Sequence, residues 1–140
     1  MNDLLKRYSF NVVANDFILA GKGSSSIKNL LKSMGINANV IRRIAIVSYE
    51  AEINIVIHSY GGKLHCDLYD DRILIISEDI GPGIKNLELA LTEGYSTAPE
   101  SIRELGFGAG MGLPNMKKYA DYFEIKSSSK GTIIKITVLL

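Results

Sequence analysis

The chain has 140 residues, which fits one domain that spans residues 1–140 and is long enough to bury about two-thirds of its unfolded surface. Its composition, with 46% hydrophobic and 22% charged residues, is that of a soluble globular protein. The net charge is +1 at pH 7, so nothing indicates bulk electrostatic binding to nucleic acid or to an acidic membrane. We therefore expect neither of them as a partner.

The cysteine content and the N-terminus both favour the cytoplasm. A lone cysteine, Cys66, cannot form an internal disulfide, which fits a reducing compartment. The first ten residues lack the long apolar core and the small-residue cleavage site of a signal peptide. No stretch approaches the roughly 18 apolar residues that a membrane span needs.

Apolar periodicity predicts a strand followed by two helices. Residues 8–13 are aromatic and β-branched, as in a strand. The serines at 24–26 offer N-cap oxygens for a first helix, and Gly35 stops it. The second helix is predicted over residues 39–58 and is apolar at most positions, so we expect deep burial. Its expected core stripe consists of Ile41, Ile44, Ala45, Ser48, Ala51 and Ile55.

Two strands and a long loop follow. Residues 64–68 alternate between apolar and polar side chains, which predicts a half-exposed strand. Residues 73–76 form a short continuous apolar run, as expected of a central strand that is buried on both faces. Residues 85–108 have weak periodicity and several glycines, so we predict a loop that holds a short helix around residues 87–91.

The last part of the chain predicts a helix and two strands. Pro114 suits the first turn of a helix that ends near residue 120. Strands are predicted at residues 122–126 and 132–140, joined by a turn. This order lacks the regular alternation of a doubly wound parallel sheet. It predicts an α+β fold, namely a two-layer α/β sandwich in which helices cover one face of a mixed sheet.

Three local features carry candidate chemistry, and the first is a pair of polar side chains on the second helix. Glu50 and Asn54 lie one helical turn apart and therefore share an edge of an otherwise apolar helix. A carboxylate and an amide oxygen so placed can serve Mg²⁺ or its waters, and a carboxylate can accept a proton. Taken alone, the pair can equally be a solvent-facing one.

The second and third features are glycine-rich. Asp79-Ile80-Gly81-Pro82-Gly83 follows the buried strand, where an aspartate can accept a hydrogen bond from an exocyclic amine such as that of adenine. An ordinary turn has the same residue types. The run from Gly106 to Gly112 leads into a helix, so its backbone N–H groups can cradle phosphate, although a flexible linker is the alternative.

Other common nucleotide and metal signatures are absent. No glycine lies five residues before Lys22, so the phosphate-loop pattern fails around residues 21–24. The Rossmann spacing does not occur in the glycine run, which also follows no strand. The two histidines and the cysteine do not form a zinc pattern.

Together these features resemble the GHKL ATPase family, which includes gyrase, MutL, sensor histidine kinases and anti-sigma factor kinases. That family has an E-x-x-x-N box, a D-x-G-x-G box, a lid that ends in G-x-G, and a late G-T pair. The matching stretches here are Glu50 to Asn54, Asp79 to Gly83, Gly110 to Gly112 and Gly131-Thr132. The resemblance covers nearly the whole chain and implies the Bergerat-type ATP-binding fold.

The resemblance implies a role for each matching residue, with ATP and Mg²⁺ as cofactors. Glu50 would act as the catalytic base, Asn54 would hold Mg²⁺ against the phosphates, and Asp79 would read adenine. A lid from about residue 85 to 112 would close over the phosphates. The remaining residues implied in nucleotide binding are Gly81, Gly83, Gly108, Gly110, Met111, Gly112 and Thr132.

Within the family, residues 48–62 (SYEAEINIVIHSYGG) are most similar to the anti-sigma factor kinases, which are stand-alone domains of similar length. This similarity implies a homodimeric serine/threonine protein kinase. It would transfer the γ-phosphate of ATP to a regulatory partner that resembles a sigma factor or an anti-sigma antagonist.

Two alternatives stay open at the level of sequence. Such kinases commonly carry an arginine just before the last G-x-G, where this chain has Gly108-Ala109. A non-catalytic nucleotide-sensing module that docks on a larger enzyme or regulator would tolerate that change. The third possibility is the catalytic domain of a split histidine kinase.

Overall fold

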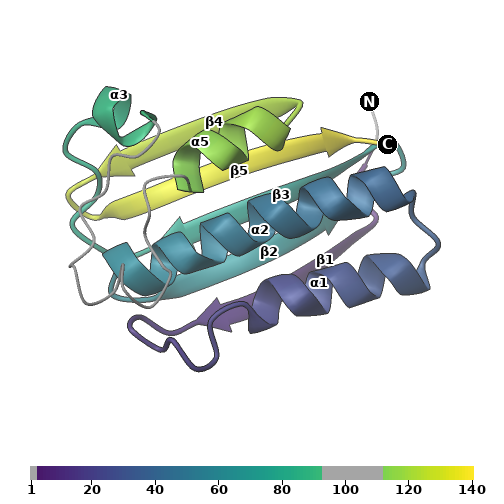
Figure 1. Cartoon of the computed structure of the whole chain (residues 1–140), viewed down its shortest axis with the longest axis horizontal. Helices are drawn as coiled ribbons and strands as arrows, with labels where there is room; N and C mark the ends of the chain where they lie inside the picture. The colour runs from purple at the N-terminus through teal and green to yellow at the C-terminus, as the bar shows by residue number, and fades with distance from the viewer. Residues whose placement is uncertain (1–2, 93–111) are drawn as a thin grey trace.

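An antiparallel sheet forms one layer of the structure and helices form the other (Figure 1). The computed structural model describes residues 3–92 and 112–140, and within them the strand order is β1-β2-β3-β5-β4. The strands are β1 (Lys6–Val12), β2 (Gly62–Leu68), β3 (Arg72–Asp79), β4 (Tyr122–Ser128) and β5 (Gly131–Leu139). The helices are α1 (Lys22–Ser33), α2 (Ala38–His58), α3 (Leu87–Ala90) and α5 (Gly112–Tyr119).

The two-layer α/β sandwich is confirmed, but the sheet is not mixed. All four neighbouring strand pairs are antiparallel. In chain order, helices α1 and α2 come between β1 and β2. The two helices run in opposite directions, so the chain returns to the end of the sheet where β1 finished (Figure 1). Strands β3 and β4 do run in the same direction, but β5 lies between them and is antiparallel to both.

Helix α2 lies between α1 and α5 and packs on the sheet (Figure 1). Its predicted stripe is buried except for Ala45, which is half-buried. Further side chains of α2, such as Val47, Ile53 and Val56, are buried as well, because neighbouring helices flank it. The fully buried side chains that it meets on the sheet include Leu64, Ile73, Ile75, Ile134 and Ile136. No helix in residues 3–92 or 112–140 has the length and apolar character of a membrane span.

Strand β2 is more buried than its alternating pattern predicts. His65 and Asp67 face away from the helices, yet they are only 6% and 2% exposed. Arg7 on β1 donates two hydrogen bonds to the Asp67 carboxylate, at 2.7 and 2.8 Å. The His65 ring lies between Ser9 Oγ at 2.8 Å and Glu78 Oε1 at 2.9 Å. Long polar side chains on neighbouring strands therefore cover this part of the open face, which the prediction of a half-exposed strand missed.

The remaining elements lie close to their predicted positions. Strand β3 is central, but Leu74 and Ile76 are only half-buried because the described helices cover one face of the sheet alone. The short helix α3 and helix α5 are present, with Pro114 in the first turn of α5. Strand β4 extends to Ser128, two residues beyond its predicted end.

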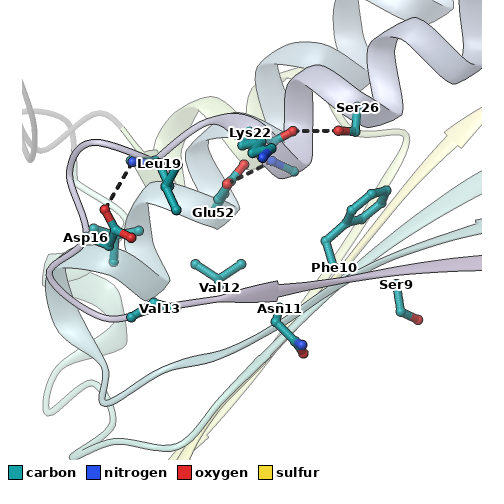
Figure 2. A pocket seen from close by; sticks show the side chains of 13 residues that line it. Ser9, Phe10, Asn11, Val12, Val13, Asp16, Leu19, Lys22, Ser26 and Glu52 are labelled. Atoms are coloured by element: carbon teal, nitrogen blue, oxygen red, sulfur yellow. Dashed lines mark hydrogen bonds between the residues drawn. The ribbon is translucent and has the colours of Figure 1, made fainter.

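Helix α1 does not begin at the serines. Its N-cap is Gly21 (φ 95°), and Ser24 and Ser26 lie inside the helix, where their hydroxyls donate to backbone carbonyls one turn back. The cap comes from α2 instead, because the buried Glu52 carboxylate accepts from three backbone N–H groups of this turn, at 2.8 to 3.1 Å. Figure 2 shows Glu52 pointing at the start of α1, beside a cavity of about 320 Å³ that reaches β1.

Glu52 should therefore be a major stabilising residue. Glu52→Ala leaves three N–H donors at a buried helix start without an acceptor, and we expect it to lower the free energy of unfolding by about 2–4 kcal/mol. Urea unfolding followed by circular dichroism measures this loss. As the control, Glu124→Ala on an exposed part of β4 should change stability by no more than about 0.5 kcal/mol. Equal losses in both variants would mean that α1 does not depend on this cap.

Candidate functional site

Asp79 ends β3 and lies against the start of β5. Its Oδ1 accepts a hydrogen bond from the backbone N–H of Thr132 at 3.1 Å. Its Oδ2 has no hydrogen-bond partner within residues 3–92 and 112–140. Partial burial raises the pKa of the Asp79 carboxyl above its ordinary value, and the hydrogen bond from Thr132 opposes that shift. One oxygen is thus fixed by the fold, while the other can accept a hydrogen bond from a ligand.

A chain of hydroxyl contacts extends from Thr132. The Thr132 side chain is buried, and its Oγ1 lies 2.8 Å from Ser127 Oγ on β4. The same Ser127 oxygen accepts a hydrogen bond from the backbone N–H of Ile84 at 2.7 Å. Ser127 therefore ties the β4–β5 hairpin to the segment that follows Asp79. The sequence pattern assigned Ser127 to a turn and missed this role.

Glycines let these segments pack backbone against backbone. A Cβ on Gly81 would lie 3.1 Å from Ser59 Cα, at the end of α2. Gly83 has a φ of 77°, and a Cβ there would overlap the carbonyl oxygen of Ser128. Gly83 is thus required by close approach as well as by its conformation, whereas at Gly81 the close approach of Ser59 alone disfavours a side chain.

The second half of the candidate site lies on α2 and at the start of α5. Glu50 is partly buried and accepts a hydrogen bond from the Asn115 side chain. A Cβ on Gly112, the first residue of α5, would lie 3.1 Å from Glu50 Oε2. Burial raises the pKa of the Glu50 carboxyl, and the hydrogen bond from Asn115 opposes that shift. A raised pKa brings a carboxylate nearer to neutral pH, which suits proton transfer.

Asn54 lies between these two parts. It is half-buried, one turn beyond Glu50, and its amide makes no hydrogen bond within the described ranges. Those ranges also hold no cluster of three or more acidic, histidine or cysteine side chains that could bind a metal ion. An amide oxygen that shares a cation with water and substrate phosphates fits the usual coordination of Mg²⁺, which keeps several waters.

The candidate residues are arranged along the axis of helix α2. Its C-terminal end lies beside Gly81, and Glu50 lies beside Gly112. Ser59 follows Glu50 by nine positions, which correspond to about 13 Å of helix rise, and Asn54 lies between them. The structure thus brings together Asp79, Gly81, Gly83 and Thr132 at one end and Glu50 and Gly112 at the other. Three further predicted residues, Gly108, Gly110 and Met111, lie outside the described residues.

Comparison with known proteins identifies a family for this chain. The family model "Histidine kinase-like ATPase domain" matches residues 21–138. The chain belongs to this family. It is 30% identical to the serine/threonine-protein kinase RsbT of Bacillus subtilis over 113 residues, which are 77% of this chain and 79% of that protein. Its expected membership of the histidine kinase-like ATPases is thereby confirmed.

Two further similarities are more limited. The anti-sigma F factor of Clostridium novyi is 33% identical over 87 residues, which are 58% of this chain and 57% of that relative's length. The solved SiaB–SiaC complex from Pseudomonas aeruginosa contains a chain that matches with a TM-score of 0.61 and 11% identity, over 96% of this chain and 89% of that one. At that identity the likeness shows the fold alone.

The sequence patterns did not identify three residues of the histidine kinase-like ATPase domain that make these contacts, namely Glu52, Asn115 and Ser127. Glu52 carried the same signal as Glu50, a carboxylate in a mostly apolar helix, so it could have been found. Asn115 and Ser127 carried none, because their partners Glu50 and Ile84 lie far away in the sequence.

Ser127 offers a direct test of the hydroxyl network. Ser127→Ala leaves the Ile84 N–H and the buried Thr132 hydroxyl without their shared partner, and we expect the free energy of unfolding to fall by about 1–3 kcal/mol. Ser129→Ala, two residues further on at an exposed position, is the matched control and should stay within about 0.5 kcal/mol of wild type. Urea unfolding compares the two, and indistinguishable midpoints would contradict the network.

Proposed function

We propose that this protein binds ATP with Mg²⁺ and transfers the γ-phosphate to a serine or threonine hydroxyl of a regulatory partner protein. The observation that carries the proposal is the order of groups along α2. An aspartate lies at the C-terminal end, with one oxygen hydrogen-bonded and the other without a partner among the described residues, and a partly buried carboxylate of raised pKa lies near the start of α5.

The Asp79 end suits the adenine base. The Oδ2 of Asp79 would accept a hydrogen bond from the exocyclic amine, while Thr132 holds the other oxygen in place. Gly81 and Gly83 let the segment after Asp79 pack closely against Ser59 and Ser128, which would hold this side of the proposed pocket in place. The network through Ser127 would keep these segments together before ATP arrives, which lowers the entropic cost of binding.

The other end suits the phosphates. We propose that Asn54 supplies one oxygen to Mg²⁺, which neutralises phosphate charge when bound, and that Gly112 forms part of a phosphate cradle. The N-terminus of α5 favours negative charge, which supports this assignment. The proposed cradle also includes Gly108, Gly110 and Met111 of a lid from about residue 85 to 112.

The proposed transfer step forms one bond, breaks one bond and moves one proton. The acceptor hydroxyl oxygen bonds to the γ-phosphorus, the bond from that phosphorus to the β–γ bridging oxygen breaks, and ADP leaves with that electron pair. Glu50 takes the hydroxyl proton. Asn115 would keep its carboxylate oriented and largely ionised, because a hydrogen bond to the charged form lowers the pKa.

Relatives support a protein acceptor, since their names are anti-sigma F factor and serine/threonine-protein kinase. We therefore propose a partner that resembles a sigma factor or an anti-sigma antagonist, in the cytoplasm. We also propose a homodimer, supported by exposed Tyr122, Ile133 and Leu139 on the face of the sheet opposite the helices. Sedimentation of the full chain measures that association.

Nucleotide binding is the first test. Calorimetric titration should show saturable binding of ATP that strengthens with Mg²⁺. Asp79→Ala should weaken it by about 10- to 100-fold, because a charge-assisted hydrogen bond contributes roughly 1.5–3 kcal/mol. Asp70→Ala, at an exposed turn between β2 and β3, is the matched control and should bind as wild type does. If the wild type did not bind ATP, the proposal would be wrong.

Phosphate transfer is the second test. With labelled ATP and an extract of the source cells, Glu50→Gln should reduce transfer by about 10²- to 10⁴-fold while ATP affinity stays close to wild type. Glu124→Gln on β4, an exposed glutamate outside the proposed lid, is the control. Acid-stable phosphate supports serine or threonine as the acceptor, and acid-labile phosphate would favour the split histidine kinase. ATP binding with no transfer at all would favour the nucleotide-sensing module.

A further inference from the structure

A groove runs over the outer side of the helix layer, away from the sheet. It has a volume of about 810 Å³ and follows α2, with α1 along one side and α5 along the other (Figure 1). Its apolar lining on α2 includes Ile41, Ala45, Ile46 and Tyr49. Tyr49 is exposed, so the groove presents apolar surface to a partner.

The groove leads to the proposed base. Glu50 and Asn115 line one end, and Ala38 at the start of α2 lines the other. The twelve residues from Ala38 to Glu50 correspond to about 18 Å of helix rise. An extended chain covers that length in about five or six residues. The groove is therefore long enough for a short extended segment whose hydroxyl reaches Glu50.

Positive charge dominates the described part of the groove. Among the described residues that line it, Lys28 and Lys32 on α1 and Arg42 on α2 are exposed, and Glu50 is the acidic one. None of the three basic side chains forms an ion pair within the described residues, whereas Arg43 next to them pairs with Asp121 at 3.1 Å. No aspartate or glutamate occurs between Asp16 and Glu50 in the chain, so α1 and the first half of α2 carry no compensating charge.

We propose that this groove binds the segment of the partner protein that carries the acceptor hydroxyl, and that the segment is acidic with apolar side chains between its acids. The inference rests on the proposed function. Arg42 lies eight residues before Glu50, about 12 Å along the helix, so the acids that it attracts lie about three to five residues from the hydroxyl. Nearer to the hydroxyl, an acid would be repelled by Glu50.

Complementary charge of this kind would affect how the partner protein is recognised, before any phosphate is transferred. Opposite potentials speed the encounter of two proteins and suppress wrong partners, and the effect weakens as salt screens the charges. Apolar side chains packed on Ile46 and Tyr49 would supply affinity that salt does not remove. The groove would thus select which protein delivers a hydroxyl to Glu50.

The test uses the full chain with ATP and Mg²⁺ and two synthetic dye-labelled peptides of twelve residues. The first has one serine, with glutamates three to five positions away and leucines between them; the second has lysine in place of each glutamate. Fluorescence anisotropy should show the acidic peptide binding wild type and the basic peptide failing to bind. Lys28→Glu/Lys32→Glu/Arg42→Glu should weaken the acidic peptide by about tenfold or more, and added salt should weaken it in the wild type.

Three controls separate the possible failures. Lys63→Glu/Lys135→Glu changes two exposed lysines on the sheet face away from the helices and should bind as wild type does. Lys28→Gln/Lys32→Gln removes charge without reversing it and should show an intermediate loss. Calorimetry on each variant should give wild-type ATP affinity, so loss of ATP binding would point to the nucleotide site instead of the groove.

Two results would overturn the inference while the proposed function stands. The first is equal binding of the acidic peptide to wild type and to the charge-reversed triple variant, with ATP binding intact. The second is preferential binding of a duplex DNA oligonucleotide or of vesicles with 30% phosphatidylserine that the triple variant abolishes. Either would assign the groove to another class of partner or to none.

Discussion

The burial of α2 is the constraint on which the rest of the structure depends. This helix packs on the sheet with one side and on α1 and α5 with the others, so polar groups on it need partners within the fold. Glu52 meets that need by capping α1, and Glu50 by accepting from Asn115. One helix thereby fixes the start of α1 and the position of a carboxylate beside α5.

The sheet contributes a second constraint, which is independent of α2. Strand β3 ends in Asp79, and the hairpin of β4 and β5 is held against it through Thr132 and Ser127. Because Ser127 also accepts from Ile84, the segment after Asp79 is fixed by a side chain from an edge strand. Changes in β4 can therefore reach the candidate adenine site without touching a ligand.

The elements and their order could be predicted from the sequence, because apolar periodicity reports which faces are buried. The motif spacing also led to Glu50, Asn54 and Asp79, which the structure arranges around α2 and the end of β3. The start of α1 could not be predicted, since its cap is a tertiary contact with Glu52 and not a local serine. Nor could the burial of His65 and Asp67, which depends on the residues that β1 and β3 place beside them.

The distribution of charge over the surface is a further property that composition alone cannot predict. A net charge of +1 argues against bulk attraction to a polyanion, yet it averages over surfaces that face different directions. The stretch without acids between Asp16 and Glu50 folds into α1 and the first half of α2, which lie side by side. Lys28, Lys32 and Arg42, which form no ion pair within the described residues, therefore share one surface. Acids elsewhere, such as Asp67 and Glu78, lie on the opposite face of the sheet and pair there with Arg7 and His65. A nearly neutral chain can therefore carry a basic groove beside its proposed catalytic carboxylate.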